Sequence, residues 1–394
     1  MADLSILAGP SDPPLAGADE ETLAKLRDER ELGRDMLLGH AERWRDDFAR
    51  YEVLAVEKSF ALPVTNPASE RASRYFDQAG VIDLVVRDRA TGLVYVIDHK
   101  TSASGMVADL LALLRFDFQA SLYPDAWERI SGERPAGFIA NVLVKRRAPK
   151  PPRVIRAKSK ADACPCGAPL ITDAKTGKPV PHALSRDKSQ STTGALYRAA
   201  LREHGLSEES YAELLAVFDA APPERYVREG VSRTPEQVAA WRTELYEASR
   251  DIRTGRVYAN PRPSECPRCP YLPLCTSDTP EARSLYRVAE IPHEEIDADE
   301  IEVRDGKDVL SQSRLKTYYQ CRMREKWAYR EKLRPITVPR ALRFGTGIHE
   351  CLAQWYRTGG ACDIIACWDA WWTLEYTRLT GRMPEGDEKF VVPF

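Results

Sequence analysis

The chain has 394 residues, of which 43% are hydrophobic and 29% charged, and its formal net charge is -2. This composition is that of a globular protein with one large domain or two to three average ones, and it excludes a disordered chain. No apolar run reaches the roughly 18 residues of a membrane span, and the N-terminus lacks a secretion signal. We therefore expect a cytoplasmic protein without a membrane partner, in which any site for a polyanion is a local basic patch.

The first part of the chain predicts a mixed α/β core over residues 21–150, after a flexible tail of residues 1–20 that is rich in Pro, Gly, Ala and Asp. Apolar residues at helical spacing mark two helices, and apolar β-type runs mark three strands. The predicted helices cover 21–51 and 107–130, and the predicted strands cover 79–88, 93–101 and 137–147. We expect a central sheet flanked by helices.

The second part of the chain divides by composition into four segments. Residues 151–190 are basic and full of turn formers, which predicts an inserted loop or arm. Residues 191–275 predict a helical region that ends in a cysteine cluster, and residues 276–309 predict an acidic linker. Residues 310–394 are again helical and rich in aromatic residues. Within the third helix of the helical region, Thr234, Pro235 and Gln237 predict a capping-box start.

The predicted hairpin of residues 79–101 carries charges where a buried strand would have none. Asp98 and Lys100 share one face of their strand, and Asp83 interrupts the apolar run of the partner strand. Two carboxylates brought together on an apolar sheet repel one another unless a cation lies between them. Oxygen ligands of this kind suit Mg²⁺ or Mn²⁺, and the lysine can orient a nucleophilic water. The alternative is a surface hairpin with exposed ion pairs of little energetic value.

These residues resemble the motif of the PD-(D/E)xK nuclease superfamily, and in particular its RecB-like branch, which includes the AddB and CRISPR-associated exonucleases. The resemblance implies a restriction-endonuclease-like core in which Asp83 and Asp98 hold Mg²⁺ or Mn²⁺ and Lys100 is catalytic. It adds the backbone carbonyl of His99 as a metal ligand. It covers most of the chain from Glu21 to Cys275 and from Leu310 to about Trp372.

Four further positions match residues that the family uses, one of them only weakly. Gln119 and Tyr123 lie one helical turn apart after the hairpin and would position the substrate, although Pro124 follows directly and can kink or end the helix. His349, after a glycine-rich turn, would be a metal ligand. Glu57 matches a weaker acidic position, which we do not include among the predicted ligands. The alternatives are an amphipathic helix with a polar edge for the pair and a structural role for the histidine.

The chain contains nine cysteines, which in the absence of a secretion signal indicates metal ligands and buried thiols. Cys266, Cys269 and Cys275 are closely spaced and require a fourth ligand from elsewhere. The resemblance supplies Cys321 and implies a [4Fe-4S] cluster. Zinc is the alternative, with a ligand from Cys164, Cys166 or His182. The remaining cysteines, Cys351, Cys362 and Cys367, are predicted to be buried thiols.

The order of these motifs differs from that of the family, because Cys321 and His349 follow the other three cysteines instead of preceding the hairpin. A circular permutation accounts for this order if the family's two termini lie close together. The alternative is a truncated tandem, in which residues 310–394 begin a second and incomplete nuclease.

The resemblance implies a metal-dependent DNA nuclease, and we expect an exonuclease-like enzyme that acts on single-stranded DNA or free ends in repair, recombination or phage DNA processing. A basic run would bind phosphates without sequence preference. Its residues are Lys145, Arg146, Arg147, Lys150, Arg153 and Arg156. No Walker A motif occurs, so a helicase or recombination partner would supply any motor. The alternatives are a non-catalytic DNA-binding scaffold and a zinc-ribbon regulator.

Overall fold

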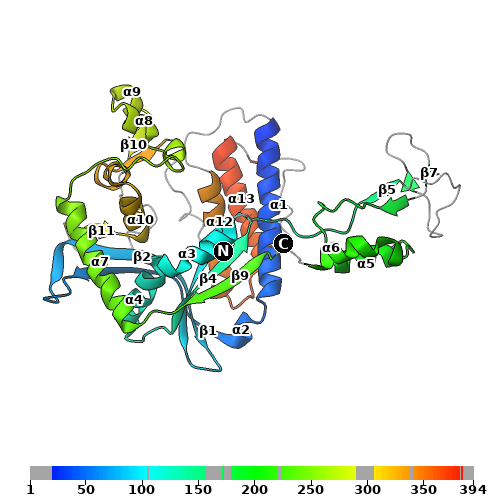
Figure 1. Ribbon diagram of the computed structural model, residues 1–394, viewed down its shortest axis with the longest axis horizontal. Helices are drawn as coiled ribbons and strands as arrows, with labels where there is room; N and C mark the ends of the chain where they lie inside the picture. The colour runs from blue at the N-terminus through cyan, green and yellow to red at the C-terminus, as the bar shows by residue number, and fades with distance from the viewer. Residues whose placement is uncertain are drawn as a thin grey trace. The chain divides into compact units, whose positions relative to one another are not determined.

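The computed structural model describes residues 20–103, 106–156, 171–172, 179–180, 182–220, 224–289, 306–336, 340–381 and 383–384. The chain divides into two units (Figure 1). The first combines Met1–Leu143 with Tyr226–Phe394, and the second is Val144–Arg225. None of the described helices combines the length and the apolar character that a membrane span requires.

Three long antiparallel strands form the main part of the sheet in the first unit. They are β1 (Tyr51–Thr65), β2 (Ala72–Asp88) and β3 (Val94–Ser102). The predicted hairpin is β2–β3, with Leu84 opposite Ile97. Its turn is closed by Gly92, whose φ of 73° favours glycine, and by the Asp88 side chain, which accepts hydrogen bonds from Ala90 N and Thr91 N.

Short or distant strands complete this sheet, in the order β1-β2-β3-β4-β9. β4 (Gly137–Val144) pairs antiparallel with β9 (Tyr226–Val231), and β11 (Asp308–Leu310) adds to β2 in parallel. β4 ends before the basic residues that the sequence analysis included in it. β1, β9 and β11 are additions to the predicted strands. The expected mixed sheet flanked by helices is confirmed.

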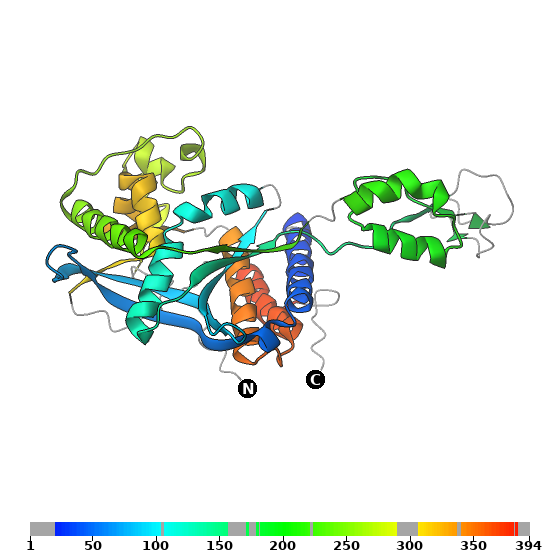
Figure 2. The same cartoon turned by 60° about the horizontal axis from the view of Figure 1, so that its bottom comes forward.

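Helices cover both faces of the sheet (Figures 1 and 2). One apolar core joins the sheet to α4 (Gln119–Ser131), α7 (Pro235–Thr254) and α10 (Gln312–Gln320). The other joins it to α1 (Glu20–Arg43), α12 (Arg340–Arg357) and α13 (Ile364–Thr380). The C-terminal helices therefore pack on the same sheet as the N-terminal hairpin.

Two predicted helices differ in the structure. The expected helix 21–51 ends at Arg43 and is followed by the short α2 (Asp47–Arg50) and by β1. The expected helix 107–130 is broken into α3 (Val107–Leu113), a 3-10 turn η3 (Leu114–Phe116) and α4. Pro124 lies inside α4 without ending it, because the helix is held by its buried face on the sheet. The predicted capping box at the start of α7 is present.

The segment predicted as an acidic linker is partly folded. Its described ends contain α9 (Pro280–Arg283), β10 (Tyr286–Val288) and β11, and β10 pairs with β12 (Leu333–Pro335). Tyr271, Tyr286 and Trp327 form a small aromatic core beside this pair, together with α8 (Leu272–Thr276). The acidic residues 290–305 lie outside the described part.

The second unit has its own apolar core around Tyr197, Leu201 and Phe218. This core is formed by α5 (Gly194–Glu203), the 3-10 turn η4 (Glu209–Tyr211) and α6 (Ala212–Ala220). β5 (Val154–Arg156) pairs with β8 (His182–Leu184), and β6 (Ile171–Thr172) pairs with β7 (Pro179–Val180). Cys164 and Cys166 lie outside the described residues, and so does the side chain of His182.

Candidate functional site

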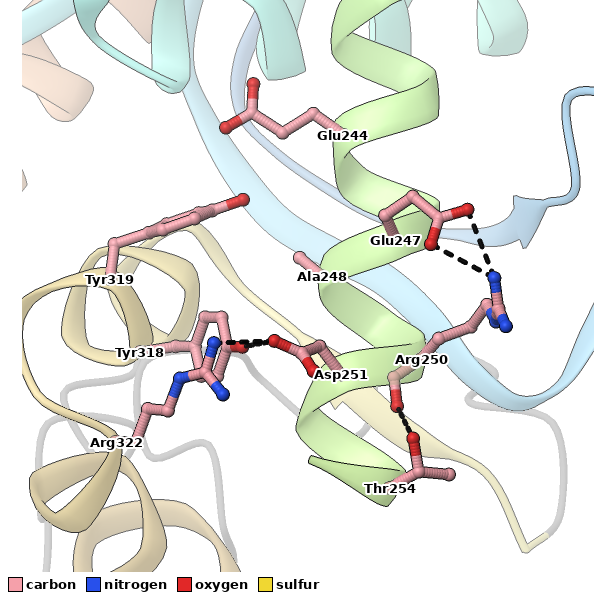
Figure 3. A pocket seen from close by; sticks show the side chains of 9 residues that line it. All are labelled: Glu244, Glu247, Ala248, Arg250, Asp251, Thr254, Tyr318, Tyr319 and Arg322. Carbon is pink, nitrogen blue, oxygen red and sulfur yellow. Dashed lines mark hydrogen bonds and ion pairs between the residues drawn. The ribbon is translucent and has the colours of Figure 1, made fainter. Parts of the chain in front are cut away.

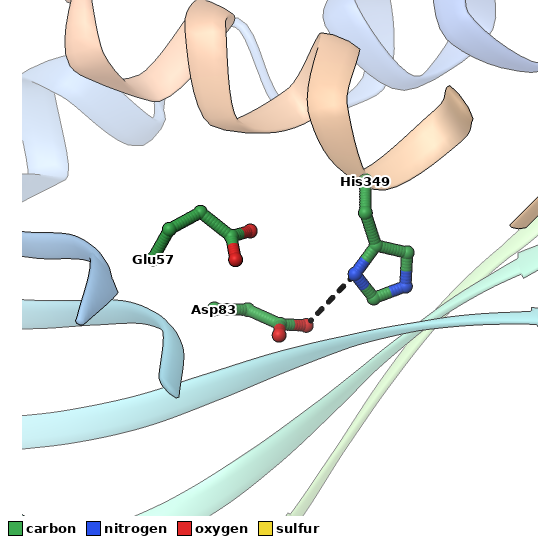
Figure 4. A group of neighbouring side chains, drawn as sticks. All are labelled: Glu57, Asp83 and His349. Carbon is green, nitrogen blue, oxygen red and sulfur yellow. Dashed lines mark ion pairs between the residues drawn. The ribbon is translucent and has the colours of Figure 1, made fainter. Parts of the chain in front are cut away.

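Three side chains from distant parts of the chain converge on one point in the first unit (Figure 4). Glu57 comes from β1, Asp83 from β2 and His349 from α12, and one ligand atom of each lies within 4.8 Å of the others. His349 Nδ1 is 3.4 Å from Asp83 Oδ2. Carboxylate oxygens with one imidazole are a donor set that binds divalent metal ions. His349 therefore lies beside Asp83 within one chain.

Glu57 reaches this point because of an unusual backbone. Its φ is 49°, a left-handed conformation that costs a non-glycine residue of the order of 1 kcal/mol. Its strand neighbours pair across to β2, Val56 with Leu84 and Lys58 with Ile82, so that Glu57 faces Asp83. Burial, and then the charge of Asp83, raise the pKa of Glu57 to about 8. Glu57 was not among the metal ligands predicted from the sequence, whereas in the structure one of its carboxylate oxygens lies within 4.8 Å of ligand atoms of Asp83 and His349.

Asp98 and Lys100 form a second group at the end of β3. Lys100 Nζ is 2.5 Å from Asp98 Oδ2 and also donates to Gln119 Oε1. Gln119 Nε2 donates to Asp98 Oδ1 at 3.2 Å and to Tyr123 OH at 3.1 Å. The spacing of Gln119 and Tyr123 thus places both side chains on the face of α4 that meets the hairpin.

The charge states of this second group are shifted by burial. Asp98 is only 2% exposed, and burial raises its pKa to about 6 although Lys100 acts in the opposite direction. Burial alone would lower the pKa of Lys100, but Asp98 raises it above its usual value. Lys100 therefore stays a cation, and it lies against a carboxylate that ionises reluctantly.

The two groups are joined through the backbone of His99. Asp83 Oδ2 accepts a hydrogen bond from His99 N at 2.7 Å, and His99 directly follows Asp98. The charge of Asp83 contributes to the raised pKa of Asp98, and the charge of His349 opposes it. A cation bound between the carboxylates would relieve this repulsion. The donor set fits Mg²⁺ or Mn²⁺.

The His99 ring lies in a buried polar network on the other side of β3. Its Nδ1 is 2.8 Å from Asn141 Nδ2, which is also 3.0 Å from His40 Nε2. Arg228 Nε donates to Asn141 Oδ1 at 3.1 Å, and its terminal nitrogens bind Asp47. No residue of this network other than His99 was singled out from the sequence. A single Asn within the apolar run "GFIANVLV" is the signal that could have indicated it.

Four cysteines line one cavity of about 90 Å³, although one of them is far away in the sequence. They are Cys266, Cys269, Cys275 and Cys321. Burial raises the pKa of the Cys275 thiol, and the charges of the other three sulfurs raise it further. The cavity is several times larger than the ~10–15 Å³ that one water needs. This is the grouping expected from the sequence.

Another cavity, of about 380 Å³, lies between α7 and α10 (Figure 3). Tyr318 and Arg322 both donate to the Asp251 carboxylate on its wall. These bonds tie the segment that carries Cys321 to α7. No residue predicted to be functional lines this cavity.

The predicted DNA-binding run lies in the second unit. Lys150 and Arg153 are exposed, and Arg153 pairs with Asp187 at 2.9 Å. Lys145, Arg146 and Arg147 are half-buried, and the side chain of Arg156 lies outside the described part.

Of the other three cysteines, Cys351 is fully buried as expected, whereas Cys362 and Cys367 are half-buried.

Comparison with known proteins yields one family. The family model described as the PD-(D/E)XK nuclease superfamily matches residues 162–276 and 309–388. No curated protein matches the chain. The matched ranges contain His349 and the four clustered cysteines, whereas Asp83, Asp98 and Lys100 lie outside them. The geometry of the hairpin and the family match are therefore separate observations, and together they support a place for this chain, with its restriction-endonuclease-like core, in the PD-(D/E)XK nuclease superfamily.

Proposed function

We propose that this protein is a metal-dependent DNA nuclease of the RecB-like type that hydrolyses phosphodiester bonds as an exonuclease. The observation that carries the proposal is the convergence of Asp83, Asp98 and Lys100 with His349 at one end of the hairpin. A surface hairpin would leave its charges in water, whereas these two carboxylates are at most 8% exposed. Buried acids beside a lysine, with shifted pKa values, are typical of catalytic sites.

The metal ligands we propose are Asp83, Asp98, His349 and the backbone carbonyl of His99, with Glu57 as an additional carboxylate. A bound Mg²⁺ or Mn²⁺ supplies an activated water and neutralises the charge that grows on the phosphate. Lys100, fixed between Asp98 and Gln119, orients the attacking water and stabilises the same charge.

Gln119 and Tyr123 are proposed to position the DNA strand. Gln119 accepts from Lys100 and donates to Asp98, so it links α4 to both charged groups at the end of β3. Tyr123 OH accepts a hydrogen bond from Gln119 Nε2, so the two side chains are held together on one face of α4.

The cysteine site is proposed to hold a [4Fe-4S] cluster. A cluster needs four thiolates and an open volume, and a cavity of about 90 Å³ lined by four cysteines provides both. Zinc at the same four cysteines is the rival reading. The bound group would fasten the residues around Cys321 to those around Cys275.

We also propose that the unusual motif order reflects a circular permutation of one nuclease domain. Two observations support it: β11 extends the sheet beside β2, and α12 packs on the strands that carry the acids. A truncated tandem would leave the C-terminal segment with a separate partner. Its residues instead share one unit with the hairpin.

The substrate we propose is DNA with single-stranded character or a free end, in repair, recombination or phage DNA processing, with a helicase as a possible class of partner. The run from Lys145 to Arg156 would contact the backbone phosphates. Binding through such contacts is indifferent to sequence and weakens steeply with salt.

The decisive experiment is digestion of end-labelled single- and double-stranded DNA by the purified full chain. We expect cleavage with Mn²⁺ or Mg²⁺ that stops in excess chelator, and a loss of about 10²–10⁴-fold in Lys100→Ala. Lys25→Ala, which removes an exposed lysine of α1, is the matched control and should cleave normally. Cleavage unchanged in Lys100→Ala would refute the proposal, and metal-loaded wild-type protein that binds DNA without cutting it would favour the non-catalytic scaffold.

The cluster is tested by iron analysis and visible absorption of protein purified without oxygen. A brown protein with about four irons per chain is expected. A colourless protein that contains zinc would contradict the cluster but leave the nuclease proposal intact.

A further inference from the structure

A cavity of about 490 Å³ lies in the first unit beside α2 and the strands β3, β4 and β9. Six of its lining residues carry the argument: Arg43, Trp44, Arg50, Tyr51, Tyr95 and Arg228. None of the residues proposed for catalysis or for the cysteine site lines it. Its volume falls within the ~300–1,000 Å³ of small-molecule sites.

Two of its arginines present charge to the solvent side. Arg43 lies over the Trp44 ring at 4.4 Å, and no carboxylate pairs with it among the residues that the structure describes. Arg50 lies over the Tyr51 ring at 4.8 Å and donates its Nε to Asp88, while 64% of its side chain remains exposed. A guanidinium has further donors at its terminal nitrogens, which suit two oxygens of one phosphate.

The third arginine fixes the base of the cavity. Arg228 stacks over Trp44 at 3.8 Å and is held by both oxygens of Asp47. Tyr356 donates to the same carboxylate, so the charge of Asp47 is already paired within the protein. Trp44 is therefore locked in place as a flat wall of the cavity.

The remaining walls are aromatic: Tyr95 is half-buried, whereas Tyr51 is only 5% exposed and lies under the Arg50 guanidinium. Tyr51 and Tyr95 line the cavity together with Trp44. Gly230 also lines it, and a Cβ at that position would meet only the carbonyl oxygen of Phe138, at 3.9 Å. Aromatic rings and arginine planes are the surfaces on which nucleobases stack, each worth about 1–3 kcal/mol per base.

We propose that this cavity binds one nucleotide, with its base stacked on Tyr95 and on the guanidinium planes that cover Trp44 and Tyr51, and with its 5′-phosphate bound by the outer nitrogens of Arg43 and Arg50. Stacking surfaces next to two accessible guanidinium groups match a planar base joined to a phosphate better than either part alone. The nucleotide is either a free mononucleotide or one unit of a DNA strand. The proposal goes beyond the nuclease function and does not depend on it.

The test measures binding by the full chain in excess chelator, where no cleavage occurs. The probes are dAMP, inorganic phosphate and a short single-stranded oligonucleotide of deoxyadenosine. We expect Arg43→Glu to weaken dAMP binding by at least about tenfold, because a carboxylate then faces the phosphate. Arg45→Glu makes the same charge change at a neighbouring residue that is 77% exposed and does not line the cavity, so dAMP binding should stay at the wild-type level.

The outcomes separate the sources of the nucleotide and the failure of each proposal. An Arg43→Glu effect on dAMP supports a mononucleotide site, and an effect on the oligonucleotide alone supports a strand site. Three results overturn the proposal: Arg43→Glu and Arg45→Glu have equal effects; neither dAMP nor the oligonucleotide binds; or inorganic phosphate binds as tightly as dAMP. Lys100→Ala should bind dAMP like the wild type, so a failed nuclease assay leaves this result unaffected. Thermal unfolding of each variant verifies that it is folded.

Discussion

At the scale of single residues, Glu57 is an acid whose burial is unfavourable in the metal-free site. It adopts a left-handed backbone and is buried opposite Asp83. If it is a ligand, Glu57→Gln should weaken Mn²⁺ binding by about 10–100-fold. Because folded Glu57 must bind a proton at neutral pH that the unfolded chain does not bind, and Gln need not, the substitution should also stabilise the metal-free protein at pH 7 by at least about 1 kcal/mol.

Calorimetric titration with Mn²⁺ and thermal unfolding in chelator measure these two effects. Glu52→Gln is the control, since Glu52 lies on the same strand, is 50% exposed and is paired only loosely with Arg87. A Glu57→Gln variant with unchanged Mn²⁺ affinity would assign Glu57 a structural role.

His40 makes stability depend on pH. Burial, and then the charge of Arg228, lower its pKa well below the usual value of 6.5. The unfolded chain takes up a proton below about pH 6.5, whereas folded His40 does not, so stability is full above that pH and falls as pH drops below it. We expect this residue alone to cost about 1 kcal/mol between pH 7.5 and 5.5.

Urea unfolding at the two pH values checks this expectation. His40→Gln should lower stability at pH 7.5 but reduce the additional loss at pH 5.5. His204→Gln, on a half-buried histidine of the second unit, should leave the pH dependence intact. A pH dependence that is identical in wild type and His40→Gln would mean that other groups cause it.

Local chemistry decided which site residues the sequence could predict. Asp98 and Lys100 alternate on one strand and Asp83 lies across a tight turn, so few residues separate them and their meeting follows from strand geometry. Glu57 was undervalued because an acid next to a lysine in "AVEKSF" looks like an exposed strand position. Its left-handed backbone is a tertiary effect that no local pattern reports.

At the scale of elements, α12 contains two glycines with different surroundings, and only one of them is needed for its close packing on α13. A Cβ at Gly347 would meet the Trp371 ring at 2.6 Å, whereas a Cβ at Gly345 would meet only Thr101 Oγ1 at 3.7 Å. Gly347→Ala must push α12 away from α13 and should destabilise the protein by about 2–3 kcal/mol. Gly345→Ala, in the same helix, should be neutral or stabilise it by up to about 1 kcal/mol.

Because α12 carries His349, the Gly347→Ala variant should also lose Mn²⁺ affinity, and the Gly345→Ala variant should not. Unfolding and Mn²⁺ titration of the two variants side by side measure both effects. Equal stability of the pair would show that Trp371 yields without moving the helix.

The elements that the sequence missed are short or depend on distant partners. β11 has three residues and exists because β2 offers them an edge. β9 contains Arg228, Glu229 and Gly230, which are poor signals for a strand, and it forms by pairing with β4. The break between α3 and α4 has no proline, and it follows from the packing of Leu114 into the core.

At the scale of the whole molecule, the proposed active site takes its residues from the hairpin and from α12 of one chain. If so, two inactive variants cannot rescue each other. We expect a mixture of Asp83→Ala and His349→Ala proteins to remain as inactive as either variant alone, because each molecule has one defective site. Recovered cleavage in the mixture, measured on end-labelled DNA, would show that two chains share sites and would favour the truncated tandem.

The fold class was predictable because the hairpin, the helical periodicity and the cysteine spacing are local signals. The separate unit of Val144–Arg225 was not recognised, since its turn-rich start and its helices differ in composition.

The late positions of Cys321, at the end of α10, and of His349, in α12, also determine when the proposed site is completed during synthesis. The acids and the lysine leave the ribosome early, but the imidazole that faces Asp83 and the fourth thiol emerge only after the whole second unit, Val144–Arg225, has been made. If the proposed nuclease function is correct, a nascent chain is inactive on nucleic acid until α12 packs on the sheet, and a translation product that ends before His349 lacks a complete site.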